Sequence, residues 1–383
     1  MKKETMTSRE RVMKTIEHKP VDRVPIDLGM HFSTSISAFA YTNLRRYLNL
    51  PCESVEVVDN GQFLARVEED VMKRFHVDCM LLHTGFKNTQ LWNPRDDYIF
   101  KVPAGIKYEQ KQDGEWIARS AADGSGYLRL PAGGFFWDGS GFSIKDRESA
   151  EAEKALAQEA ERIYKETDYY TVYMGYSGYF RDNPDFLCDM LLNPDEIKEN
   201  NEKTLQREIE RAGKNIKLLG KNIQAVCVSE DLGTQSAPFC NPEQYAELCA
   251  PYHKKFMDFI HKNSDWKIFF HTCGAMEPMI PILIDCGVDI LNPVQVSCSN
   301  MEPNNLKQKY GDKITFWGGG CDTQGAFSTG TQEEVKENVR ELMRVFKPGG
   351  GFVFNQVHNV MGNVTPENIV AMLDTAYENA FYE

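Results

Sequence analysis

The chain has 383 residues, of which 42% are hydrophobic, so it is long enough to bury a large core. Its formal net charge of −13, from 43 basic and 56 acidic residues, would repel phosphate backbones and anionic lipid surfaces. We therefore expect neither nucleic acid nor a membrane surface as a partner. Residues 1–20 are charged throughout, and no run approaches the roughly 20 apolar residues of a membrane span, which predicts a cytoplasmic protein. The ten cysteines are scattered along the chain, which predicts free or metal-bound thiols rather than a disulfide framework.

In chain order, the first predicted element is a helix over residues 7–18, with Ser8 as its N-cap. Short apolar runs then recur, each closed by polar or glycine residues. Most are rich in Val, Ile or Phe, which is typical of parallel strands buried on both sides. The eight runs cover residues 24–29, 77–83, 170–176, 225–233, 267–274, 288–295, 314–321 and 351–358.

Helical stretches lie between most of these runs. Residues 193–215 and 241–263 both begin with an Asn-Pro pair, which supplies an N-cap and a proline at the first helical position. Residues 331–346 begin with Thr331 and place Glu334 for a capping box. Eight strands alternating with helices predict an α/β fold, a (β/α)8 TIM barrel forming a single domain over residues 1–383. An open doubly wound sheet stays an alternative because the sequence does not reveal strand order, although no GxGxxG turn follows the first strand.

Residues 84–142 break this alternation, because they contain turn signals and short alternating strands. They predict a β-rich insertion after the second strand. On the catalytic face of a barrel such an insertion can act as a lid, and a solvated decoration is the alternative.

Metal-capable side chains stand at the C-terminal ends of the predicted strands, where barrel enzymes place their active sites. His271 and Cys273 are two residues apart at the end of one strand, so they project to the same side. Cys321 ends another strand, after three glycines that leave space around it. One histidine and two cysteines suit tetrahedral zinc, and three protein ligands leave one position open, as in catalytic sites. The structural alternative is a buried histidine with two small buried thiols.

Other polar residues at the strand ends are candidates for catalysis or binding. We expect Glu230 and Asp231 to supply a fourth metal ligand or a proton acceptor, with loop and helix capping as the alternative. Asp27 and His358 are expected to orient the substrate, although a lone histidine is more often structural. The candidate cofactor-binding residues are Gln295, Asn292 and Asn355.

Several segments together resemble the superfamily of uroporphyrinogen decarboxylase and its related zinc methyltransferases. They are RERVMKTIEHKPVDRVPIDLG, EDLGTQSAPFCNPEQY, FFHTCG, DILNPVQ, GGGCDTQ and GGGFVFNQVHNV, spread over most of the chain. The resemblance implies a (β/α)8 barrel. In the methyltransferase branch it also implies zinc held by a His-x-Cys pair and a distant cysteine, at positions that match His271, Cys273 and Cys321.

The superfamily contains decarboxylases and methyltransferases, and the segment after DRVP helps to choose between them. The decarboxylases need arginines there to bind a polycarboxylate, whereas IDLGMHFSTSISAFA has no basic residue except His31. The resemblance therefore implies zinc-dependent methyl transfer in corrinoid-dependent one-carbon metabolism, like the methylcobalamin:coenzyme M methyltransferases. A corrinoid (cobalamin) protein would be the partner.

The particular residues of GGGCDTQ and EDLGTQ depart from the coenzyme M enzymes. The methyl donor and acceptor therefore stay open, with a thiol, tetrahydrofolate or a methylated substrate as the choices. A metal-free decarboxylase or lyase on the same barrel is the competing function, and a non-catalytic binding protein is a third. The oligomeric state is also open, a homodimer included.

Overall fold

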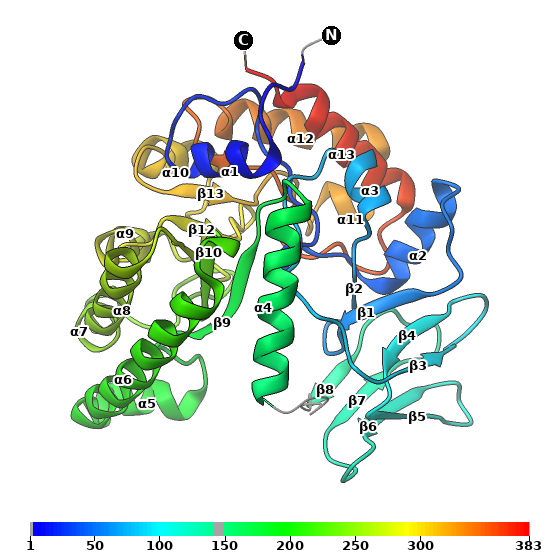
Figure 1. Ribbon diagram of the computed structural model, residues 1–383, viewed down its shortest axis with the longest axis horizontal. Helices are drawn as coiled ribbons and strands as arrows, with labels where there is room; N and C mark the ends of the chain where they lie inside the picture. The colour runs from blue at the N-terminus through cyan, green and yellow to red at the C-terminus, as the bar shows by residue number, and fades with distance from the viewer. Residues whose placement is uncertain (1–2, 141–148, 383) are drawn as a thin grey trace.

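The computed structural model describes residues 3–140 and 149–382 of the chain. Its largest sheet has six parallel strands in the order β14-β13-β12-β11-β10-β9 (Figure 1). Neighbours in this sheet are also consecutive in sequence, so these six strands lack the reversal of order that defines a doubly wound sheet. The strands are β9 (Val172–Ser177), β10 (Ala225–Ser229), β11 (Lys267–His271), β12 (Ile290–Asn292), β13 (Thr315–Trp317) and β14 (Phe352–Val353).

The first two predicted strands are present as isolated parallel bridges at the two edges of this sheet. Ile26 pairs with Phe354, just after β14, and Cys79 pairs with Tyr170, just before β9. The two segments also meet each other, because the Asp78 backbone N–H donates to the Ile26 carbonyl at 2.8 Å. The Ile26 N–H is bonded to the Asp78 carboxylate at 2.8 Å instead of a neighbouring carbonyl, which shortens the ladder here. The prediction of an α/β fold with a parallel sheet is confirmed, and the arrangement is consistent with a (β/α)8 barrel.

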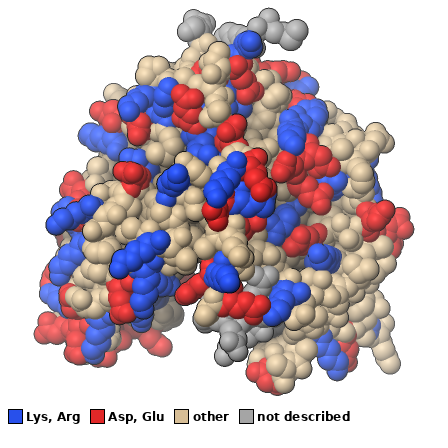
Figure 2. Space-filling model, viewed as in Figure 1, with Lys and Arg blue, Asp and Glu red and all other residues tan. Residues whose placement is uncertain are grey.

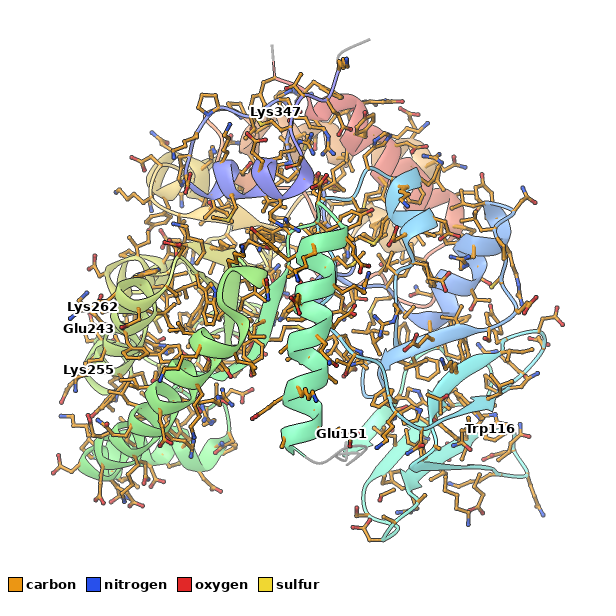
Figure 3. All side chains as sticks on the ribbon, in the orientation of Figure 1. Trp116, Glu151, Glu243, Lys255, Lys262 and Lys347 are labelled. Atoms are coloured by element: carbon orange, nitrogen blue, oxygen red, sulfur yellow. The ribbon has the colours of Figure 1, made fainter. Side chains whose placement is uncertain are left out.

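Helices cover the outside of the sheet (Figure 1). Their apolar faces lie in the core and their charged faces in solvent: on α8, Phe256 and Met257 are buried, whereas Lys255 and Lys262 are exposed (Figure 3). The helices are α1 (Ser8–Ile16), α2 (Ala38–Tyr47), α3 (Glu69–Arg74), α4 (Ser149–Glu166), α5 (Pro184–Leu192), α6 (Pro194–Leu219), α7 (Pro242–Leu248), α8 (Ala250–Asn263), α9 (Ile280–Cys286), α10 (Pro303–Tyr310), α11 (Ala326–Thr329), α12 (Gln332–Phe346) and α13 (Pro366–Ala380).

Three details of the predicted helices were wrong. Asn193 stands at the N-cap position of α6, but its side chain makes no capping bond and donates to Asp189 instead. The N-cap of α1 is Thr7, whose hydroxyl accepts from the Glu10 N–H at 3.3 Å, because the Ser8 hydroxyl instead donates to Asp78 at 2.8 Å. The single helix over 241–263 is two helices, α7 and α8, which meet at Cys249 with a proline in the first turn of α8. The capping box of α12 is confirmed.

Antiparallel strands recur along the segment over 84–142. The strands are β3 (Thr89–Trp92), β4 (Phe100–Pro103), β5 (Ile106–Gln110), β6 (Trp116–Ser120), β7 (Tyr127–Leu130) and β8 (Asp138–Ser140). Strands β5 to β8 form one sheet, and β3 and β4 join the unexpected strands β1 (Val55–Asp59) and β2 (Leu64–Ala65) in another. Aromatic side chains fill this region: Trp92 stacks on Tyr108 at 4.3 Å, and the Trp116 indole N–H donates to the Pro94 carbonyl at 2.9 Å (Figure 3). Residues 141 and 142, the end of the predicted insertion, lie outside the described residues.

Basic and acidic side chains are interspersed over the face of the molecule shown in Figure 2. Across the described residues, every helix is too short or too polar to cross a membrane. All ten cysteines are free thiols, as expected from their scatter along the chain.

Candidate metal centre

The centre begins at the end of β11, where the sequence HTCG leaves the sheet. The imidazole of His271 and the thiol of Cys273 lie on the same side, with Nε2 and Sγ 3.7 Å apart, while Thr272 between them is buried and accepts from the Leu232 N–H at 3.0 Å. Gly274 follows at φ +99°, and a Cβ there would overlap the carbonyl oxygen of Gly233. The turn after β11 is therefore held tightly against the loop after β10.

His358 completes a group of three metal-capable side chains. Its donor atom and those of His271 and Cys273 all lie within 4.8 Å of one another, and this is the one such group in the described parts of the chain. Tetrahedral zinc with its usual Zn–N and Zn–S bond lengths would place nitrogen and sulfur about 3.6 Å apart. The observed 3.7 Å between His271 Nε2 and Cys273 Sγ fits this geometry without rearrangement.

The histidines of this centre favour their neutral form, which is the form that binds metals. Burial lowers the pKa of His271, although Asn292 and Asp231 oppose the shift. Burial, and then the nearby His271, lower the pKa of His358 to about 4, with Asp231 again opposing. The pKa of the Cys273 thiol is raised, first by burial and then by Asp231, so without a cation the sulfur keeps its proton.

Asp231 borders the centre. Its Oδ1 accepts from the Cys273 N–H at 2.9 Å and lies 3.9 Å from His271 Nε2. The carboxylate is 45% exposed, so it is open to solvent on its other side. This position is compatible with the predicted roles of fourth ligand or proton acceptor.

Cys321 is not a member of this group. Its side chain is completely buried in the main hydrophobic core, and its carbonyl accepts from the Val357 N–H at 2.9 Å. Burial, followed by Asp322, raises the pKa of its thiol. The structure thus brings His271 and Cys273 together as predicted but groups them with His358 rather than with Cys321.

Glu230 is turned away from the centre toward α7 and α8. Its carboxylate accepts from the Tyr245 hydroxyl at 2.6 Å, from His253 Nε2 at 2.8 Å and from the Phe180 N–H at 2.9 Å. Burial would raise the pKa of Glu230, but His253 and these hydrogen bonds outweigh it and lower the pKa. These contacts are those of a structural carboxylate, and the role of Glu230 in catalysis stays a prediction.

The remaining predicted residues form two pairs. Gln295 and Asn292 flank the centre: Gln295 Oε1 accepts from the Gly274 N–H, and Asn292 Oδ1 lies 3.0 Å from His271 Nδ1. Asp27 and Asn355, like Asn292, are completely buried. They bond to each other through the Asn355 amide and the Asp27 carbonyl at 3.1 Å.

Sequence reasoning overlooked His31 and Ser33 as members of this region. The His31 ring lies 5.2 Å from the His271 ring, and its Nε2 is 3.4 Å from the buried sulfur of Cys227. Ser33 donates to Asn292 Oδ1 at 2.7 Å. The available signal was their position directly after the first apolar run, at the same edge as the other strand ends.

The geometry places the protein in the class of parallel α/β proteins that gather polar and metal-capable groups at the carboxyl ends of their strands. Within that class, the chain belongs to the uroporphyrinogen decarboxylase (URO-D) family, whose model matches residues 173–379, more than half of the chain. The resemblance seen in the sequence motifs is thereby confirmed.

Curated relatives agree with this assignment, and a solved structure shares the fold. The uroporphyrinogen decarboxylases of Pseudoalteromonas atlantica and Pseudoalteromonas translucida are 21% and 23% identical over 144 residues. These matches span 36% of this chain and 38% of each relative's length. A methyltransferase from Methanosarcina mazei has the same fold with a TM-score of 0.56 and 12% identity, covering 98% of this chain and 99% of that one.

Proposed function

We propose that the protein is a zinc-dependent methyltransferase of corrinoid-dependent one-carbon metabolism, built on a closed (β/α)8 barrel. It would move a methyl group between a corrinoid carried by a partner protein and a thiol, tetrahydrofolate or a methylated substrate. The observation that carries the proposal is the His271–Cys273–His358 group, whose spacing suits zinc. The structural neighbour from Methanosarcina mazei is named a methyltransferase, which supports the same function.

His271 and Cys273 would hold the metal, and His358 is the third ligand that the geometry favours over the predicted Cys321. Bound zinc would supply a Lewis acid with one exchangeable position. Asp231, half-exposed and 3.9 Å from His271 Nε2, is placed to take the proton of an incoming thiol. Its bond from the Cys273 N–H keeps it oriented toward the centre.

The buried ion pair of Arg23 favours methyl transfer over decarboxylation as the activity. It is the arginine of the DRVP segment, yet it is buried and bonded to Asp78 at 2.7 Å. It is therefore not free to bind a substrate carboxylate, and the segment after it offers no other arginine. A metal-free decarboxylase or lyase remains the alternative. Metal analysis of the purified protein would distinguish it from a zinc-dependent methyltransferase.

The insertion over 84–142 is proposed as a lid. Its Phe135 lies so close to Gly362, four residues after His358, that a Cβ on that glycine would be 2.7 Å from Phe135 Cβ. The insertion therefore contacts the loop that carries a candidate ligand. Phe136 beside it is 43% exposed and is available to meet a substrate or the corrinoid partner.

Metal analysis of purified variants tests the proposal. We expect about one zinc per chain in the wild type, and loss of that zinc together with methyl transfer from methylcobalamin in His271→Ala and Cys273→Ala. His358→Ala should lose zinc as well if it is the third ligand. If Cys321→Ala loses zinc while His358→Ala retains it, the ligand set predicted from sequence holds instead.

Cys188→Ala is the matched control, because Cys188 is an exposed thiol outside the centre, and it should keep full zinc and activity. A wild-type protein purified under mild conditions without stoichiometric zinc would contradict the proposal and favour the metal-free alternative.

A further inference from the structure

We propose that Asn292 is a positioning residue that fixes the tautomer and ring orientation of His271. This inference rests on the proposed zinc site and explains how one of its ligands is prepared for the metal. Asn292 is the last residue of β12 and is completely buried. It is the parallel partner of His271 in the sheet, so their side chains emerge side by side.

The orientation of the Asn292 amide is determined by its neighbours. Its Nδ2 donates to the Trp317 backbone carbonyl at 3.0 Å. A carbonyl oxygen can only accept, so the NH2 group must face Trp317 and Oδ1 must face the opposite side. There Oδ1 accepts from the Ser33 hydroxyl at 2.7 Å, which opposes a flip of the amide from its other end.

The amide orientation in turn determines where His271 carries its proton. His271 Nδ1 lies 3.0 Å from Asn292 Oδ1, and this oxygen can only accept, so Nδ1 must be the donor. In a neutral imidazole with hydrogen on Nδ1, the free lone pair is on Nε2. That nitrogen faces Cys273 Sγ at 3.7 Å. The bond to Asn292 therefore leaves the lone pair of His271 Nε2 directed at the position that the metal would occupy.

Three distant parts of the chain cooperate in this arrangement. Ser33 follows the first apolar run and is 259 residues from Asn292, while Trp317 ends β13. The chain of contacts passes from Ser33 to Asn292 and on to His271. Partners of this kind, which bond to the nitrogen of a ligand that does not bind the metal, typically change metal affinity 10–100-fold when removed.

Substitutions at position 292 separate orientation from packing. Asn292→Leu keeps the approximate volume but removes the acceptor, and we expect its zinc affinity, measured by competition with a chelator, to fall about 10–100-fold. Asn292→Asp keeps an acceptor for Nδ1 and should bind zinc within a few-fold of the wild type. Asn201→Leu is the matched control, since it makes the same substitution at a buried asparagine of α6 whose amide donates to the Leu248 carbonyl, outside the centre. The zinc affinity of this control should equal that of the wild type.

A second measurement needs no zinc and no change at Asn292. Two-bond ¹H–¹⁵N correlation spectra of the metal-free wild type, with selectively labelled histidine, report the tautomer of each neutral ring, and His271→Ala assigns the signal. We expect the Nδ1–H form. The Nε2–H form, or an Asn292→Leu protein that folds and binds zinc as tightly as the wild type, would overturn the inference.

The two proposals fail in different ways. Absence of zinc from every protein, with His271 still in the Nδ1–H form, would sink the metal-dependent function but leave the positioning role of Asn292 intact. If the wild type holds stoichiometric zinc and Asn292→Leu binds zinc with the same affinity, the zinc site stands and the positioning role of Asn292 fails. If Asn292→Leu does not fold, the tautomer of His271 in the wild-type protein decides whether the inference holds.

Discussion

At the scale of single residues, Cys273 and Cys321 are two thiols predicted for one site that occupy different environments. Cys273 lies beside His271, with its backbone N–H bonded to Asp231 at 2.9 Å. Cys321 is completely buried, with its sulfur among core side chains. Cys321 is packed among core side chains, whereas the donor atoms of His358, His271 and Cys273 lie within 4.8 Å of one another. Packing therefore favours His358 over Cys321 as the third ligand. Metal analysis of His358→Ala and Cys321→Ala tests this choice.

Asp27 gives a prediction of pH dependence. Its carboxylate is completely buried and accepts from the Trp317 indole at 2.9 Å and the Met30 N–H at 3.1 Å. Burial raises the pKa of Asp27 to about 6 in the folded protein, despite these bonds. The folded state therefore holds the proton more tightly than the unfolded state. The stabilisation from the protonated form is complete below about pH 4 and is lost as pH rises through about 6.

Asp27→Asn cannot ionise, so comparing it with the wild type isolates this effect. The free energy of unfolding of the wild type, relative to the variant, should fall on the order of 3 kcal/mol between about pH 4 and about pH 7. Urea denaturation at several pH values within that window measures the difference. A difference that does not vary with pH would show that Asp27 has an ordinary pKa in the folded state.

At the scale of elements, the ends of β10 and β11 are tied together by their loops. The Gly233 N–H donates to the Cys273 carbonyl at 3.1 Å, and the Ala275 N–H donates to the Thr234 carbonyl at 2.7 Å. Glycine at 274 permits this close approach. Cys273 therefore stands on a turn held by backbone hydrogen bonds rather than on a free loop.

Helix α12 supplies a prediction about capping. The Thr331 hydroxyl accepts from the Glu334 N–H, and the Glu334 carboxylate accepts from the Thr331 N–H at 2.7 Å. Thr331→Ala removes half of this box and should destabilise the protein by about 1 kcal/mol, measured by chemical denaturation. Gln332→Ala, at the next and exposed position, is the control and should be neutral. Equal stability of the two variants would mean that the box contributes nothing.

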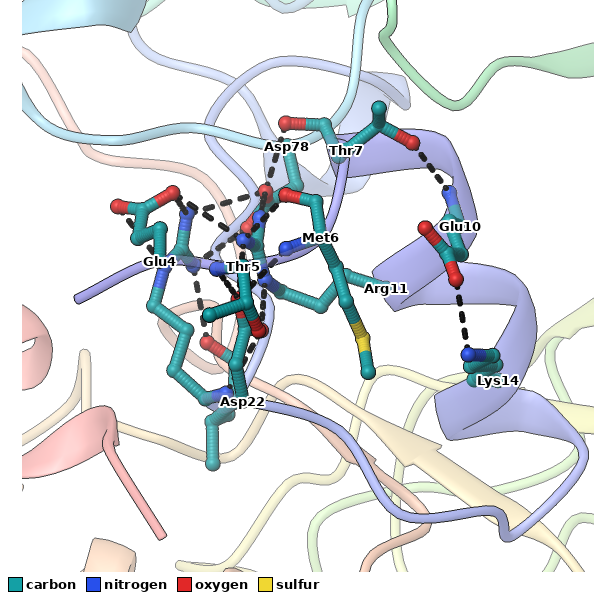
Figure 4. Close-up of polar contacts among 12 residues, drawn as sticks. Glu4, Thr5, Met6, Thr7, Glu10, Arg11, Lys14, Asp22 and Asp78 are labelled. Carbon is teal, nitrogen blue, oxygen red and sulfur yellow. Dashed lines mark hydrogen bonds and ion pairs between the residues drawn. The ribbon is translucent and has the colours of Figure 1, made fainter.

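At the scale of the whole molecule, a buried charge network joins the N-terminal segment to the edge of the sheet (Figure 4). The Asp78 carboxylate, completely buried, bonds to Arg11 at 2.6 Å and to Arg23 at 2.7 Å. Arg11 also bonds to Asp22 at 2.6 Å, and Arg23 lies 3.2 Å from Glu4. Because Asp78 also bonds to the Ile26 N–H, the network holds the two short edge segments in position.

Asp78→Asn should be strongly destabilising, because it leaves two buried arginines without their shared carboxylate. Removing one partner of a buried ion pair typically costs about 3–5 kcal/mol, and we expect a loss of that size in the free energy of unfolding by urea denaturation. Glu69→Ala is the control, since its pair with Lys73 is exposed and should contribute less than about 1 kcal/mol. A small effect at Asp78 would mean that the arginines find other partners.

The sequence by itself determined those features that depend on local periodicity and spacing. Buried apolar runs alternating with amphipathic helices specified a parallel α/β fold, because these patterns are set by a few neighbouring residues. The projection of His271 and Cys273 to one side followed from the alternation of side chains along a strand. The capping box of α12 followed from two residues three positions apart.

The tertiary structure alone decided which distant groups meet. His358 joins His271 and Cys273 although the strands before them are not neighbours in the sheet, and Cys321 turns into the core. Glu230 is bound by Tyr245 and His253 from the next two helices. Such contacts depend on strand register and on side-chain packing across the whole sheet, which no local stretch of sequence encodes.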